Sequence, residues 1–172
     1  MKTILKSLTI ATLFLAATAA QAGILIEPYV GSGTSITTGE SGGTEIPTSG
    51  DTVSGSSMGA RLGYGMLGFH AGIDYDMITF DGEKQTNTGV FVSYKLPIML
   101  RVYAAQVLSA TNNDGEKVDG LTATKIGIGF TSLPFVNLNL EYSIQKISVS
   151  DPIEMSLNTR VIGFSASLPF DI

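Results

Sequence analysis

The sequence predicts an all-β protein, an eight-stranded antiparallel up-and-down transmembrane β-barrel, and three observations predict it. Apolar and polar residues alternate with a period of two in eight segments, whereas helical spacing is hard to find. Most of these segments run for about 9 to 13 residues, close to the roughly 9–11 that a tilted strand needs to cross a bilayer. The polar positions of these segments contain most of their glycines and equal numbers of acidic and basic residues, which is the composition expected of a crowded barrel interior.

The composition excludes several classes of protein. Of 172 residues, 44% are hydrophobic and only 15% are charged, against about 25% charged in ordinary soluble domains. The chain has 20 glycines and neither cysteine nor tryptophan. A disordered chain, a disulfide scaffold, a nucleic-acid binder and a helical membrane protein are all disfavoured, and the length fits one domain.

Residues 1–22 are predicted to be a cleaved signal peptide. Lys2 and Lys6 give a positive start, an apolar run follows at 10–20, and Ala20-Gln21-Ala22 is a small-x-small cleavage signal. The mature barrel domain would then be 23–172, with a net charge of −7, because the two lysines leave with the leader. We expect export through the Sec pathway and a fold that is stable without disulfides.

Loop lengths support the barrel topology. The predicted strands are 24–33, 57–65, 69–80, 88–96, 99–110, 121–131, 136–145 and 156–170. The connections between them alternate between long and short, namely 34–56, 66–68, 81–87, 97–98, 111–120, 132–134 and 149–155. Long exterior loops and short periplasmic turns are typical of outer-membrane barrels.

The polar phase of the strands is predicted to face the barrel axis. It carries four acids and four bases that we expect to form an interior salt-bridge network: Glu27, Asp74, Asp76, Glu141, Arg61, Lys95, Arg101 and Lys125. Confined ions need partners, since an unpaired buried ion costs several kcal/mol. Ten glycines share this phase, and the narrow inside of an eight-stranded barrel is where space is short. In the hairpin 58–75, Arg61 should lie opposite Gly72 and reach Asp74.

The apolar phase is predicted to face lipid. It contains no Lys or Arg at mid-depth, where either would cost about 2–4 kcal/mol. Aromatic residues on this phase beside the short turns should form a periplasmic girdle: Tyr64, Phe69, Tyr94, Phe130 and Phe170.

The order of these motifs resembles the small eight-stranded outer-membrane barrels of Gram-negative bacteria, the OmpX and OmpA-barrel type. The resemblance covers 23–172 and is carried by 24–31 (ILIEPYVG), the hairpin 58–75 and the closing segment 168–172 (LPFDI). It implies location in the outer membrane, contact with lipid and lipopolysaccharide, and recognition of the C-terminal strand by the barrel-assembly machinery. Family members usually end in an aromatic residue, whereas this chain ends in Ile172. We expect a monomer with a structural or surface-interaction role.

Two alternatives remain beside this interpretation, a lipid A-modifying outer-membrane enzyme and a soluble lipocalin-like binding barrel. Residues 55–59 fit a G-x-S-x-G pattern around Ser57, but no helix is expected after it. His70, Asp74 and Asp76 share a strand face, yet His70 and Asp76 would lie about 20 Å apart along it. We therefore predict no catalytic, cofactor-binding or metal-binding residues.

The remaining charge is predicted to make the exterior loops acidic. The acids outside the interior set are Glu40, Glu45, Asp51, Asp81, Glu83, Asp114, Glu116, Asp119, Asp151, Glu154 and Asp171. Only four bases lie outside the interior set: Lys84, Lys117, Lys146 and Arg160. Such loops either bind divalent cations that bridge lipopolysaccharide or oppose aggregation.

Overall fold

A computed structural model describes residues 22–41, 44–46, 52–133, 135–149 and 155–172. Residues 1–21 of the predicted signal peptide lie outside these residues. The strands are β1 (Gly23–Ser41), β2 (Thr44–Ile46), β3 (Val53–Met66), β4 (Phe69–Phe80), β5 (Glu83–Leu96), β6 (Leu100–Thr111), β7 (Leu121–Leu133), β8 (Val136–Val149), β9 (Met155–Ser167) and β10 (Phe170–Asp171). The described residues include no helix that is long and apolar enough to span a membrane.

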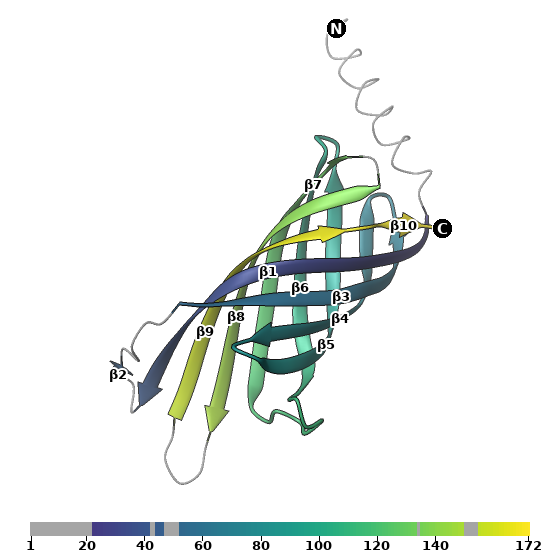
Figure 1. Ribbon diagram of the computed structural model, residues 1–172. Helices are drawn as coiled ribbons and strands as arrows, with labels where there is room; N and C mark the ends of the chain where they lie inside the picture. Colours follow the sequence, from purple (N-terminus) through teal and green to yellow (C-terminus); the bar gives the residue numbers. More distant parts are fainter. Residues whose placement is uncertain (1–21, 42–43, 47–51, 134, 150–154) are drawn as a thin grey trace, which may run out of the picture.

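Eight long strands close into one antiparallel barrel (Figure 1). From β3 to β9 each strand pairs with its neighbour in sequence, and β1 closes the circle by pairing with both β3 and β9. The short β2 is a hairpin extension of β1, and β10 continues β9 after Leu168 and Pro169 and also pairs with β1. The predicted all-β, eight-stranded up-and-down barrel is confirmed.

The barrel has two distinct ends. At the turn end, Leu67 and Gly68 form a two-residue turn, and backbone hydrogen bonds join Ile24 to Ile172. At the loop end, residues 112–120 form a long loop between β6 and β7. Asn112 stabilises this loop because its side-chain oxygen accepts hydrogen bonds from the backbone N–H groups of Asp114 and Glu116.

The predicted long connection at 81–87 is wrong. β4 and β5 are joined by Asp81 and Gly82 alone, with φ angles of 50° and 83°. Asp-Gly favours a type I′ turn because both of its central residues need positive φ, and this turn matches the twist of a hairpin. The polar residues after the turn continue the strand, so connection length does not alternate strictly around the barrel. β1 and β3 likewise extend into the predicted loop 34–56.

The register of the first short hairpin also differs from the prediction. Arg61 lies directly opposite Asp74, and Gly72 faces Gly63 instead. The predicted three-residue connection was one residue too long, since Met66 pairs with Phe69 as the last rung of the ladder.

The two walls of the barrel have opposite polarity. The outer wall exposes a band of apolar side chains, which includes Val30, Leu62, Ile73, Val92, Ile126, Ile128, Leu138 and Ile162. The inner wall buries polar and charged side chains, as the alternation predicted. The lumen is not wholly polar, because Leu25, Phe91 and Ala105 form a small buried apolar cluster inside it.

The predicted girdle residues lie on the outer wall toward the turn end. Tyr64, Phe69, Phe130 and Phe170 are exposed. Phe69 and Tyr94 are cross-strand partners whose ring centroids lie 4.3 Å apart, so Tyr94 is half-buried beneath its neighbour.

Candidate functional site

Seven charged side chains from six strands meet inside the barrel. They are Glu27 of β1, Arg61 of β3, Asp74 and Asp76 of β4, Arg101 of β6, Lys125 of β7 and Glu141 of β8, and we call them the central cluster. Strand pairing sets their height, because Glu27, Arg61 and Asp74 are direct partners across β1, β3 and β4. Alternation along each strand turns all seven side chains toward the axis.

Arg61 is the centre of this cluster. Its side chain is 1% exposed and lies 3.7 Å from Glu27, 3.6 Å from Asp74 and 3.5 Å from Glu141. The guanidinium also lies between two aromatic rings, 4.5 Å from the centroid of Tyr29 and 4.4 Å from that of Tyr103. One cation therefore joins carboxylates from three strands, and the rings hold it in place by cation–π contact.

Glu27 forms the second connection across the lumen. It accepts hydrogen bonds from Arg101 at 2.7 Å and from Ser167 at 2.5 Å. Arg101 donates its other terminal nitrogen to Asn139 at 2.9 Å. These contacts link β1, β6, β8 and β9, which are not all neighbours in the sheet, so they bridge the lumen as well as its wall.

Lys125 completes the cluster on the loop-end side. Its ammonium lies 2.6 Å from Asp76 and 3.4 Å from Asp74. Neutral donors supply the remaining bonds: Tyr29 donates to Asp74 at 3.0 Å, and Ser165 donates to Glu141 at 2.7 Å. Tyr103 also donates a short hydrogen bond to Glu141.

Lys95, the eighth residue of the predicted network, lies outside the central cluster. Its ammonium pairs with Asp171 at 2.6 Å near the turn end, and His70 Nε2 lies 3.5 Å from the same carboxylate. Asp171 follows the last predicted membrane-crossing segment, and hydrogen bonds from His70 and Lys95 hold the pKa of its carboxyl below the ordinary value. Asp171, predicted as one of the acids outside the interior network, therefore has an ion-pair partner of its own near the turn end.

Glycines make room for the rings in the lumen. Gly59 is the cross-strand partner of Tyr29, and Gly127 is that of Tyr103. A methyl group built on Gly59 would lie 2.6 Å from the Tyr29 ring, and one on Gly127 would overlap the Tyr103 ring. The tyrosine rings occupy the space beside the glycines, and both contact Arg61. The inward phase of both tyrosines was visible in the sequence, but their pairing with glycine depends on register.

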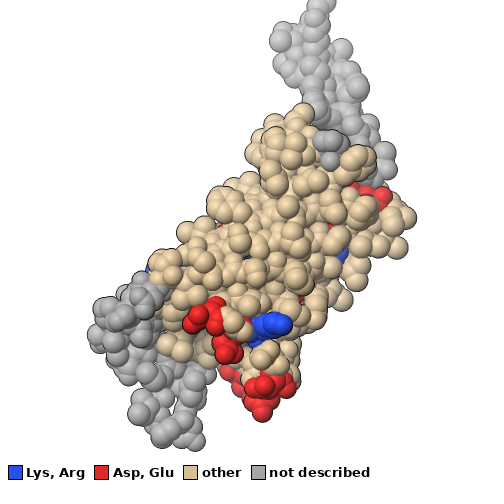
Figure 2. Space-filling view, viewed as in Figure 1, with Lys and Arg blue, Asp and Glu red and all other residues tan. Residues whose placement is uncertain are grey.

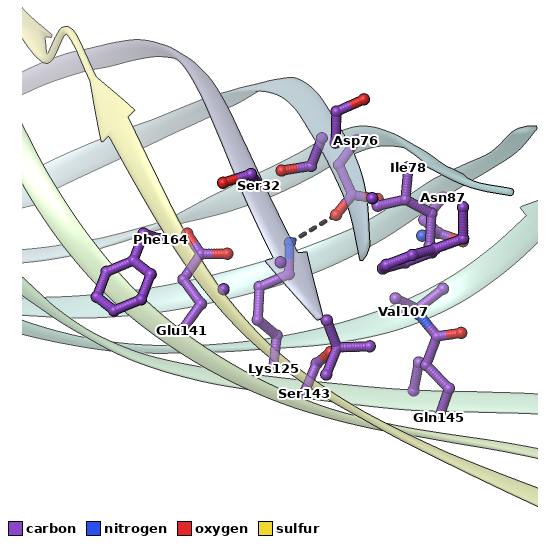
Figure 3. Close-up of a pocket in the computed structure, with 18 of the residues that line it drawn as sticks. Ser32, Asp76, Ile78, Asn87, Val107, Lys125, Glu141, Ser143, Gln145 and Phe164 are labelled. Atoms are coloured by element: carbon purple, nitrogen blue, oxygen red, sulfur yellow. Dashed lines mark hydrogen bonds and ion pairs between the residues drawn. The ribbon is translucent and has the colours of Figure 1, made fainter. Parts of the chain in front are cut away.

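The lumen opens toward the loop end through two successive hollows. A cavity of about 60 Å³, the inner cavity, lies against Asp76, Lys125 and Glu141 (Figure 3). Beyond it a wider vestibule of about 370 Å³ shares Ile78, Phe80 and Gln145 with the inner cavity. Side chains at the mouth include Glu83 and Lys84. The central cluster thus forms the floor of a pocket that is reached from one end of the barrel.

The pattern around Ser57 lies inside β3 and has no helix after it. Within the described part of the chain, no three His, Cys, Asp or Glu side chains are placed to hold a metal ion. The charged groups of the cluster bind one another. This arrangement links charged side chains of the protein to one another across the lumen.

Acidic side chains are exposed at the loop end. Figure 2 shows a group of them there, with few basic side chains beside it. The exposed acids at this end include Asp81, Glu83, Asp114, Glu116 and Asp119, against Lys84 and Lys117. The side chains of the other acids predicted in exterior loops, Glu40, Glu45, Asp51, Asp151 and Glu154, lie outside the described residues.

The chain is similar to known proteins in structure rather than in sequence. The sequence matches no protein-family model and no curated protein. The structure is similar to a de novo designed transmembrane β-barrel, with a TM-score of 0.54 and 15% identity, over 86% of this chain and 96% of the designed one. It is also similar to neisserial surface protein A (NspA), with a TM-score of 0.50 and 15% identity, over 83% of this chain and 97% of NspA. The chain therefore has the fold of the small eight-stranded transmembrane β-barrels.

Proposed function

We propose that this chain is an integral protein of the Gram-negative outer membrane, exported through the Sec pathway, with a structural or surface-interaction role. The observation that carries the proposal is the polarity of the two walls. An exposed apolar band surrounds a lumen in which Arg61, Glu27 and Arg101 are at most 2% exposed. In water this arrangement would expose apolar surface and bury ions at a cost, whereas lipid favours it. It also opposes the soluble lipocalin-like alternative, whose lumen would be apolar.

We further propose that the central cluster closes the lumen to diffusing solutes. Contacts of 2.6 to 3.7 Å join its members across the axis, and the ring of Tyr29 fills the space beside Gly59. A barrel of this size has an interior that side chains can fill, whereas porins need about twice as many strands. The exposed groups that meet the exterior are then those of the acidic loop end.

Lipid and lipopolysaccharide are the partners that this surface fits, and the protein would act as a monomer. The apolar band meets acyl chains, and the aromatic girdle lies where headgroups would be. We propose that the barrel-assembly machinery reads the C-terminal strand. This proposal is supported by the position of β9 and β10, which pair with β1 and so close the barrel.

The geometry gives no support to the enzymatic alternative. Ser57 pairs with Ile78 on β4, eight residues from His70, which corresponds to about 26 Å along a strand. His70 is 4% exposed, faces the lumen and contacts Asp171. A general base must lie within hydrogen-bond reach of its nucleophile, so these two residues do not form a catalytic pair.

Membrane fractionation and gel migration test the proposal. We expect the protein in the outer-membrane fraction, released only by detergent, and we expect the unboiled form to migrate differently from the boiled form in SDS. Recovery from a periplasmic extract without detergent would contradict it. Conductance in planar bilayers tests the closed lumen separately, and steady open-pore currents from the wild-type protein would refute closure without refuting the location.

A further inference from the structure

The central cluster carries one negative charge more than its own bases neutralise. Its acids are Glu27, Asp74, Asp76 and Glu141, and its bases are Arg61, Arg101 and Lys125. Lys95, which would have balanced the set, pairs with Asp171 near the other end. The remaining described bases, Lys84, Lys117, Lys146 and Arg160, are exposed. A confined surplus charge is costly unless a counter-charge meets it.

The surplus is concentrated at Asp76. Glu27, Asp74 and Glu141 each receive contacts from at least three side chains. Asp76 receives one, from Lys125 to its Oδ2, although its side chain is only 4% exposed. Its Oδ1 is buried with no hydrogen-bond partner among the described residues. A buried acceptor without a partner is costly, so a further ligand would stabilise this oxygen more than any other carboxylate oxygen of the cluster.

Asp76 lines the inner cavity, where it is joined by other oxygen-bearing groups. Figure 3 shows Asp76, Lys125 and Glu141 around this hollow, with Asn87 and Ser143 also on its wall. Asn87 is the direct cross-strand partner of Asp76, so the two side chains share one face. Every hydrogen bond to Glu141 shown by the described residues ends at Oε1, which leaves Oε2 free to accept.

We propose that the inner cavity binds one small monovalent metal cation, such as Na⁺ or K⁺, at Asp76 Oδ1. The ligand atoms on its wall are oxygens of carboxylate, amide and hydroxyl groups, which suit hard cations. One positive charge matches the surplus, whereas a divalent ion would reverse it. The volume of about 60 Å³ exceeds the roughly 10–15 Å³ that a single water needs, so a partly hydrated ion fits. The vestibule gives it a path from the loop end.

This cation site is an addition to the proposed role in the outer membrane and does not depend on it. Its test requires only the folded barrel. Protein folded in uncharged detergent micelles is unfolded by heat in NaCl, KCl or N-methylglucamine chloride at equal ionic strength, and circular dichroism follows the transition. A bound ligand stabilises the native state by mass action, so we expect a midpoint about 2–4 °C higher with either metal ion than with the bulky organic cation. Equal midpoints in all three salts would overturn the proposal.

Two carboxylate variants locate the site. Asp76→Asn removes the surplus charge and keeps the shape of the side chain, so we expect its midpoint to be the same in all three salts. Asp114→Asn, at an exposed loop position, is the matched control and should keep the wild-type difference. If Asp76→Asn keeps that difference, the assignment to Asp76 is wrong.

Direct detection of the ion decides the case in which Asp76→Asn does not fold. The ²³Na resonance of a dilute NaCl solution should broaden when wild-type protein in micelles is added. Added KCl should reverse the broadening, and N-methylglucamine chloride should leave it unchanged. Absence of broadening, or reversal by both salts alike, would refute a specific cation site.

Discussion

Replacement of Arg61 by methionine tests whether the central cluster stabilises the barrel. Arg61→Met keeps most of the length of the side chain but leaves Glu27, Asp74 and Glu141 without the cation that lies 3.5 to 3.7 Å from each of them. At these distances each attraction is about 4 kcal/mol in a medium of intermediate polarity. Desolvation of the ions offsets most of the total, and removing one partner from a buried ion cluster costs about 3–5 kcal/mol net.

The assay is urea unfolding of the protein in lipid vesicles, followed by far-ultraviolet circular dichroism because the chain has no tryptophan. We expect Arg61→Met to lower the free energy of unfolding by about 3–5 kcal/mol. Arg160→Met is the matched control, because this arginine is exposed on the outer wall, and its effect should stay within about 0.5 kcal/mol.

A change of less than about 1 kcal/mol in Arg61→Met would contradict a stabilising role of the central cluster, because it would be little larger than the effect of about 0.5 kcal/mol expected for a surface substitution. A second variant distinguishes a loss of stability caused by unpaired charge from one caused by lost packing. Asp74→Asn added to Arg61→Met removes one of the carboxylates that lose this cation and so lowers the excess negative charge, and the double variant should therefore be more stable than Arg61→Met alone. If it is less stable, the loss arises from packing against Tyr29 and Tyr103 rather than from unpaired charge.

Three further substitutions examine the outer wall, the glycine contacts and the turn-end ion pair, all measured by the same unfolding assay. Ile128→Lys places a charge on the exposed apolar band and should cost about 2–4 kcal/mol. Gly127→Ala pushes a methyl group into the ring of Tyr103 and should cost about 1–3 kcal/mol by overpacking. Lys95→Met should cost at most about 1 kcal/mol, because the Lys95 and Asp171 side chains are 24% and 28% exposed.

For each of these substitutions there is a control variant or a result that would contradict the prediction. Thr122→Lys, exposed near the loop end, should be nearly neutral, and equal costs at Thr122 and Ile128 would argue against a lipid-facing band. Gly163→Ala places its methyl group 3.1 Å from a backbone carbonyl rather than in a ring, so it should cost less than Gly127→Ala. A loss from Lys95→Met as large as that from Arg61→Met would contradict the separation of Lys95 from the central cluster.

Part of the candidate site could be predicted from the sequence, and part could not. Alternation along a strand turns every second side chain inward, so the inward positions of Glu27, Arg61 and Glu141 needed no structure. Their pairing did need one, because a turn that is one residue shorter moves one strand past its neighbour. Asp171 was missed because it follows the last alternating segment, where periodicity carries no signal.

Alternation along the chain assigns each residue to the inner or the outer wall, since a period of two is a local property of a strand. The barrel, its apolar outer wall and its ionic lumen were therefore predictable from the residues alone. The pairing of the ions was not, because it depends on contacts between distant strands. Arg101 reaches Glu27 across 74 residues of sequence, whereas Lys95 turns to Asp171 and leaves the central cluster with an excess of negative charge. Such pairings depend on closure of the barrel and on strand register, which turn geometry sets and which alternation along one strand does not contain.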